Sequence, residues 1–173
     1  MKNQPFFSSL IICASLFLSA CGGGESEAGG GGSDIKSFSV TGSDGRNSKV
    51  ATIDPAINEG LFEANWKVDN FGRYWVRMAV SSDRKYGVGD RLFFDEDCGA
   101  FGDICPQGDA SVLCGFDNNN VIACDSAGGD AWMGPDLTSF LNVLPKRAFI
   151  VVEVCTMTST FGCFWTSKPI EFR

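Results

Sequence analysis

The sequence lacks histidine altogether: none occurs among its 173 residues. Without an imidazole, the chain has no Ser-His-Asp or Cys-His catalytic set and no histidine metal site. It also lacks the Gly-x-Ser-x-Gly turn of many hydrolases and the Gly-x-x-x-x-Gly-Lys loop that holds phosphates. Paired carboxylates for acid–base chemistry on a sugar remain, but no particular pair is marked out. We therefore expect a protein that is not an enzyme, with a hydrolase of unfamiliar type as an alternative.

Basic residues are missing from a long stretch of the chain. No Lys or Arg occurs between Leu92 and Pro145, and the formal net charge of the whole chain is −7. The same stretch holds nine carboxylates: Asp95, Glu96, Asp97, Asp103, Asp109, Asp117, Asp125, Asp130 and Asp136. Proteins that bind DNA or RNA need a basic surface to contact phosphates. We therefore expect no nucleic-acid partner and no electrostatic adsorption to anionic lipid.

The chain's N-terminal hydrophobic run is short for a helix that crosses a membrane, which makes a spanning helix the weaker alternative. The apolar stretch 6–20 contains fifteen residues, and as a helix it would rise only about 22 Å against a hydrocarbon core of roughly 30 Å. Lys2 is the only charge before it, and small residues end it. This pattern predicts a secretory signal peptide over residues 1–20.

The end of the signal reads Leu18-Ser19-Ala20-Cys21, which resembles the lipobox of bacterial lipoproteins. The resemblance implies cleavage before Cys21 and lipidation of its sulfur and amino group. In the resembled family, an aspartate directly after the lipidated cysteine tends to retain the protein at the inner membrane. This chain has Gly22 at that position, which favours the outer membrane, on either its periplasmic or its outer side. Several acyl chains hold a protein firmly, so the membrane becomes the first expected partner. The alternative is a soluble secreted protein with an unmodified Cys21.

Residues 21–34 form the expected linker. Seven glycines, two glutamates and no aromatic residue follow Cys21 before position 35. Such a composition buries too little apolar surface to offset the entropy lost on ordering. We expect a flexible tether of about 20 Å, followed by one domain over residues 35–173.

Six cysteines lie beyond the linker, at Cys98, Cys105, Cys114, Cys124, Cys155 and Cys163. An even number in an exported chain predicts three disulfides, although six cysteines allow many connectivities. Local patterns favour neighbours, because the last two pairs each flank a turn between β-type runs and the first pair closes a small loop. Zinc is the weaker alternative, since Cys-x-x-Cys and histidine are both missing.

Apolar residues alternate with polar ones in several short runs, as expected of half-buried strands. In the run 62–68 the apolar residues are Phe62, Ala64, Trp66 and Val68; in the run 73–80 they are Tyr74, Val76, Met78 and Val80. Further strands are expected at 35–40, 148–156, 161–167 and 170–172. Trp66 and Tyr74 are expected in the core, whereas Trp75 and Trp165 are expected on outward faces. Short strands separated by turns predict an all-β, antiparallel β-sandwich.

Four motifs recur in a known superfamily: Phe62-x-Ala64-x-Trp66, Tyr74-x-Val76, Val143-Leu144-Pro145 with Phe149, and Ser167-Lys168-Pro169-Ile170. They resemble the fibronectin type III and immunoglobulin-like sandwiches, over residues 35–95 and 136–173. Two positions depart from the pattern. Phe149 replaces the tyrosine of the E–F corner, and Glu153 stands where an apolar residue is expected, so the better apolar stripe is Ile150, Val152 and Val154.

Residues 96–135 are expected as a disulfide-rich loop insertion. Hard carboxylate ligands for calcium could come from this region and its border, at Asp95, Glu96, Asp97, Asp125 and Asp130, although solvated acidic loops are the simpler interpretation. No other cofactor is expected. Trp132 and Met133 lie in a glycine-rich stretch, either as contacts to a ligand or partner or as a cover for the core.

Together these features predict a lipoprotein of the bacterial outer membrane that is not an enzyme. Its domain would act as a binding or structural module at the cell envelope, with another envelope protein as partner and the acidic insertion as contact surface. A calcium- or carbohydrate-binding module is the alternative.

Overall fold

The computed structural model describes residues 35–68, 73–99, 105, 108–125, 132–156 and 162–173. Within these ranges the chain forms ten strands and one short 3-10 turn at Asn58–Gly60. The strands are β1 (Ile35–Thr41), β2 (Ala51–Ile53), β3 (Leu61–Val68), β4 (Tyr74–Ser81), β5 (Arg91–Cys98), β6 (Asp109–Phe116), β7 (Val121–Cys124), β8 (Trp132–Asp136), β9 (Lys146–Thr156) and β10 (Cys163–Phe172). The predicted all-β class is confirmed.

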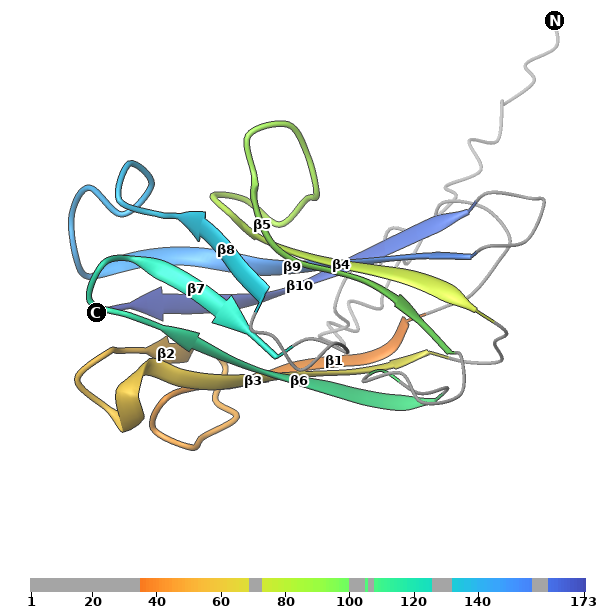
Figure 1. The fold of residues 1–173 in the computed structure, drawn as a ribbon, viewed down its shortest axis with the longest axis horizontal. Helices are drawn as coiled ribbons and strands as arrows, with labels where there is room; N and C mark the ends of the chain where they lie inside the picture. The colour runs from red at the N-terminus through yellow and green to blue at the C-terminus, as the bar shows by residue number, and fades with distance from the viewer. Residues whose placement is uncertain (1–34, 69–72, 100–104, 106–107, 126–131, 157–161) are drawn as a thin grey trace, which may run out of the picture.

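The strands make two sheets that face each other (Figure 1). The first sheet has the order β1-β3-β6-β7-β8, and the second has the order β2-β10-β9-β4-β5. Neighbours run antiparallel except β2 and β10, which are parallel. The predicted β-sandwich is therefore present.

The core lies between the sheets and follows the predicted alternation. Phe62, Ala64, Trp66 and Val68 of β3 are buried, as are Tyr74, Val76, Met78 and Val80 of β4. The Trp66 indole Nε1 donates a hydrogen bond to the Tyr74 hydroxyl, at 3.3 Å. The stripe Ile150, Val152 and Val154 of β9 is fully buried. Alternation places every second side chain of these strands in the core and the others outside.

The segment 96–135 contributes more to the sandwich than a loop insertion would. β6 pairs along its length with β3, and Val112, Cys114 and Phe116 are buried in the core. β7 and β8 extend the same sheet to its edge. The turn predicted between Cys114 and Cys124 thus joins two strands of the first sheet, and β6 is the central strand of that sheet.

The C-terminal strand is also longer than expected. The sequence indicates a break between 161–167 and 170–172, whereas β10 continues through Pro169, which pairs with Phe149. Proline has no N–H to donate, so it is tolerated only where a ladder bond is not required. β2 begins beside Ile170, and Pro169 therefore precedes the part of β10 that has neighbours on both sides.

The domain begins at one end of the sandwich, and two loops lie at the opposite end. Ile35 pairs with Val68, and the Trp66–Tyr74 hydrogen bond places that end of β3 beside the start of β4. Because β4 and β9 are antiparallel, Ser81 and Lys146 lie at the opposite end. The loops 82–90 and 137–145 therefore stand away from the point at which the domain begins (Figure 1).

Candidate functional site

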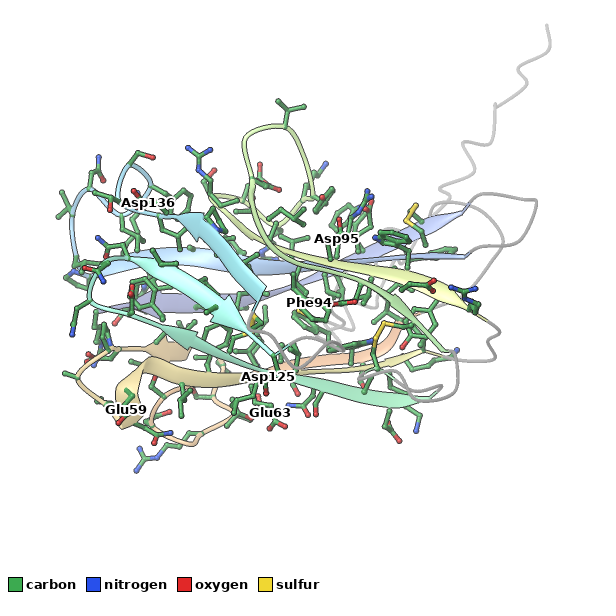
Figure 2. The ribbon with its side chains drawn as sticks, viewed as in Figure 1. Glu59, Glu63, Phe94, Asp95, Asp125 and Asp136 are labelled. Atoms are coloured by element: carbon green, nitrogen blue, oxygen red, sulfur yellow. A yellow bond between two sulfur atoms is a disulfide. The ribbon has the colours of Figure 1, made fainter. Side chains whose placement is uncertain are left out.

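One face of the second sheet carries large polar and aromatic side chains. Four of these residues lie in one row across the strands. Asp95 of β5 is the register partner of Arg77 on β4, and Arg77 is in turn the partner of Glu153 on β9. Glu153 is the partner of Trp165 on β10. Trp75 lies two residues before Arg77, on the same face. We call Trp75, Arg77, Asp95, Glu153 and Trp165 the outer-face cluster. Figure 2 shows Phe94 between the sheets and Asp95 on the outer side of β5.

Hydrogen bonds and ion pairs link the outer-face cluster. The Trp75 indole Nε1 donates to Asp95 Oδ1, and Arg77 Nε donates to the same oxygen at 3.4 Å. On its other side, Arg77 Nη1 lies 4.0 Å from Glu153 Oε2. The Arg77 guanidinium also lies 5.7 Å from the centre of the Trp75 ring. One arginine thus connects two carboxylates and an indole on three strands.

The carboxylates of this cluster are shielded from water. The side chains of Asp95 and Glu153 are 20% and 15% exposed, whereas Arg77 is 40% exposed. Burial raises the pKa of Glu153 above its ordinary value; Arg77 opposes this shift, and Asp95 adds to it. A carboxylate with this environment holds a proton more readily than one in solution.

The loop 82–90 covers part of the same face. Ala79 and Val151, on the outward side of β4 and β9, are fully buried. Arg84 lies 5.8 Å from the ring centre of Phe149. Burial, together with the charge of Glu153, raises the pKa of Tyr86. The loop therefore lies against the outer face and borders the outer-face cluster.

No family model matches the chain, and no curated protein or solved structure matches it either. In the part of the chain that the structure describes, no helix is long and apolar enough to cross a membrane. Because no match is found, the chemistry of the outer-face cluster must be inferred from its own side chains. Two half-covered indoles next to a shielded Arg–carboxylate network offer apolar contact together with directed hydrogen bonds, the composition of a binding surface.

The predicted disulfides are confirmed as three neighbouring pairs. Cys98 joins Cys105, Cys114 joins Cys124, and Cys155 joins Cys163. The second pair lies directly across β6 and β7 and is buried, and the third lies across β9 and β10 at the end where the connection between these two strands begins. The expected lipidation residue, Cys21, lies outside the described residues.

Among the described residues, the calcium ligand candidates do not come together at one site. Asp95 and Asp97 are paired with Arg77 and Arg73, and alternation turns Glu96 to the opposite side of β5. Asp125 lies with Glu63 on the first sheet, away from Asp95 (Figure 2). Asp130 lies outside the described residues. Among the described residues, a metal-compatible set of three occurs only at Glu153, Cys155 and Cys163, and its two sulfurs are bonded to each other.

Other carboxylates of the acidic region stabilise turns. Asp117 Oδ1 accepts hydrogen bonds from the N–H groups of Asn119 and Val121, at 3.0 and 2.8 Å. The bond from Val121 is the main cause that lowers the pKa of Asp117. Asp136 accepts the N–H of Thr138 at 2.7 Å. These acids have a local structural role.

The predicted contact residues Trp132 and Met133 fall in β8, the edge strand of the first sheet, where they pair with Cys124 and Ala123. Their side chains lie outside the described part of the structure. The sequence did predict Trp75 and Trp165 on outward faces, and the structure places both on the same sheet. The alternation that turns Trp75 outward also places Arg77 beside it, whereas Glu153 and Tyr86 were not predicted there. The available signal was Glu153, a lone charge inside the apolar run 148–156.

Proposed function

We propose that this chain is a lipoprotein of the bacterial outer membrane, without enzymatic activity, whose sandwich binds another envelope component through the outer-face cluster. The partner we expect is an envelope protein, because the surface combines indoles with a charged network. Interfaces between proteins are enriched in tryptophan and arginine at their centres.

The sequence supports the location. A short apolar segment ends in the lipobox-like Leu18-Ser19-Ala20-Cys21, and a glycine-rich linker follows it. Lipid chains on Cys21 would hold the protein at the membrane while the linker lets the domain reach its partner. Replacement of Cys21 by Ser is expected to release the protein from the membrane fraction. Retention of the Cys21→Ser protein in that fraction would contradict the proposed anchor.

The strand order supports the immunoglobulin-like resemblance. β1, β3 and β6 lie together in one sheet, and β10, β9 and β4 lie side by side in the other, as the A-B-E and G-F-C strands of such sandwiches do. This architecture has many functions, so it selects none. The proposal depends instead on one observation: the shielded Asp95–Arg77–Glu153 network between Trp75 and Trp165.

The outer face of the first sheet makes a natural comparison. Its exposed positions include Ser37, Ser111 and the ion pair Lys67–Asp109, whose Nζ and Oδ2 atoms are 3.1 Å apart. Leu113, opposite Glu63, is 45% exposed. Surface ion pairs of this kind contribute little to binding. Leu113 is an exposed apolar side chain on the other sheet, so it provides a matched control for Trp165.

The test compares Trp165→Ala with Leu113→Ala in the full chain, produced in its own bacterium and cross-linked in the intact envelope. We expect the cross-linked complex to be lost with Trp165→Ala and kept with Leu113→Ala. Thermal unfolding of each purified variant checks that the sandwich persists. Equal complex formation by both variants would contradict the proposal. Calorimetric titration with calcium and with neutral glycans tests the alternative, a small-ligand module.

A further inference from the structure

A groove lies between the loops 82–90 and 137–145, at the end of the sandwich away from Ile35. Its volume is about 410 Å³, within the range of small-molecule sites, roughly 300–1,000 Å³. The residues that matter for its chemistry are Ser82, Lys85, Asp90, Ser139, Phe140 and Lys146. Hydroxyl groups, ammonium groups and one aromatic ring therefore line the same space.

The two loops that border the groove, together with the strand ends beside them, hold more basic than acidic residues. Residues 82–91 and 137–147 contain five basic residues, Arg84, Lys85, Arg91, Lys146 and Arg147, and two acidic ones, Asp83 and Asp90. The whole chain carries a net charge of −7. Among these seven charged residues, Lys85, Lys146, Asp83 and Asp90 line the groove, whereas Arg147 lies 3.5 Å from Glu171 and Arg84 lies over the Phe149 ring. The two lysines are therefore the groups that an anionic ligand would meet.

Both carboxylates of the groove have structural partners. Asp83 Oδ1 accepts a hydrogen bond from the Lys85 backbone N–H at 2.7 Å, and Asp90 Oδ2 accepts one from the Gly87 N–H at 2.9 Å. The buried Ser81 hydroxyl accepts the Asp83 N–H at 3.2 Å. These bonds fix the loop 82–90 and hold the groove's shape without a ligand.

Arg91 lies at the junction of the two loops. Its Nη2 donates to Ser139 Oγ at 3.4 Å, and its Nε is buried with no hydrogen-bond partner among the described residues. Lys146 lies 5.7 Å from the ring centre of Phe140. A buried donor that lacks an acceptor is costly. Through Ser139, which lines the groove, Arg91 links the two loops.

We propose that this groove binds an anionic saccharide, a sugar ring that bears a carboxylate or a phosphate. Lys85 and Lys146, which line the groove, attract the charged group. The hydroxyls of Ser82 and Ser139 pair with ring hydroxyls, and the Phe140 ring offers an apolar face for the ring's C–H groups. The site is separate from the outer-face cluster and does not depend on it.

The test uses the full chain in a neutral detergent and titrates it calorimetrically with three probes: a uronic-acid oligosaccharide, a hexosamine phosphate and a neutral oligosaccharide of equal length. We expect one or both anionic probes to bind, less tightly as salt increases, and the neutral one not to bind. The anionic probe that binds identifies the charged group as carboxylate or phosphate.

The variant Lys146→Met should weaken binding about tenfold, because one charge-assisted contact is lost. The control Lys168→Met removes an exposed lysine that bonds Asn47 on another part of the surface, at 3.2 Å, and should leave binding unchanged. No binding of either anionic probe, equal binding of the neutral probe, or equal affinity in Lys146→Met would each overturn the proposal. Trp165→Ala should bind as the unaltered chain does, so this result is independent of the outer-face cluster.

Discussion

Arg77 on β4 and Glu153 on β9 are register partners, and their side chains meet on the outer face with Nη1 and Oε2 4.0 Å apart. Their attraction does not fully offset the burial of the carboxylate, because the pKa of Glu153 is raised. The folded environment therefore favours the neutral form of this carboxyl more than water does. Such conditions occur more often at functional sites than elsewhere.

This relationship predicts a pH-dependent effect of Glu153→Gln. A carboxyl whose pKa is higher in the folded state binds protons more readily there, so its contribution to stability is greatest below its ordinary pKa and is lost as pH rises through the folded value. Glutamine cannot ionise. As pH rises above the ordinary pKa of glutamate, about 4.3, the free energy of unfolding of the unaltered protein should therefore fall relative to that of Glu153→Gln. Urea titrations at several pH values measure this difference, and a pH-independent difference would be inconsistent with the buried carboxylate.

Replacement of Tyr74 by Phe should destabilise the sandwich by about 1–3 kcal/mol, because the buried Trp66 Nε1 loses its acceptor. Trp66→Phe with Tyr74→Phe completes a double-mutant cycle. The cycle should show a coupling of about 0.5–1.5 kcal/mol. Additive effects of the two replacements would show that the hydrogen bond contributes nothing.

Gly60 and Gly45 both have φ of +72°, but their surroundings differ. A Cβ at Gly60 would lie 2.0 Å from the Phe116 carbonyl oxygen, whereas a Cβ at Gly45 would meet nothing within 4 Å. Gly45→Ala should cost only the left-handed backbone strain, about 1–2 kcal/mol. Gly60→Ala should cost more than about 4 kcal/mol because the backbone must also shift. Thermal unfolding compares the two, and equal costs would mean that β6 does not approach Gly60 as closely as described.

The disulfides differ in what surrounds them. Cys114–Cys124 and Cys155–Cys163 close loops with similar sequence separations, 10 and 8, so chain entropy assigns each about 2.5–3 kcal/mol. Cys114 and Cys124 are also part of the core. Replacing both by Ala should therefore destabilise the domain more than replacing Cys155 and Cys163 by Ala. The reverse order in denaturant unfolding would show that packing around β6 and β7 is unimportant.

Local sequence patterns were enough to predict most of the fold. Alternation identified β3 and β4 with their buried sides, and neighbouring cysteines predicted all three disulfides. The place of β6 beside β3 was not predicted, because pairing between distant segments depends on the whole sheet and leaves no local pattern. The outer-face cluster was not predicted for the same reason. Arg77 and Glu153 are 76 positions apart in the numbering, and only the strand register brings them together.

The groove between the loops 82–90 and 137–145 could not be predicted from local sequence patterns either. Phe140 and Lys85 belong to loops whose composition indicates only turns, and the sequence drew attention to the acidic stretch instead. The two loops meet because β4 and β9 are antiparallel neighbours. Lys85 and Lys146, which lie outside the acidic stretch, therefore line the same groove.

Hydroxyl-radical footprinting of the full chain is the most direct test of the outer-face cluster as a contact surface. The chain is oxidised once in the intact envelope and once after purification in detergent, and modification is compared at Trp75, Trp165 and Leu113. The account predicts that Trp75 and Trp165 are protected in the envelope while Leu113, on the other sheet, reacts equally in both. Equal reactivity of the two tryptophans in both preparations, or protection of Leu113 alone, would contradict it.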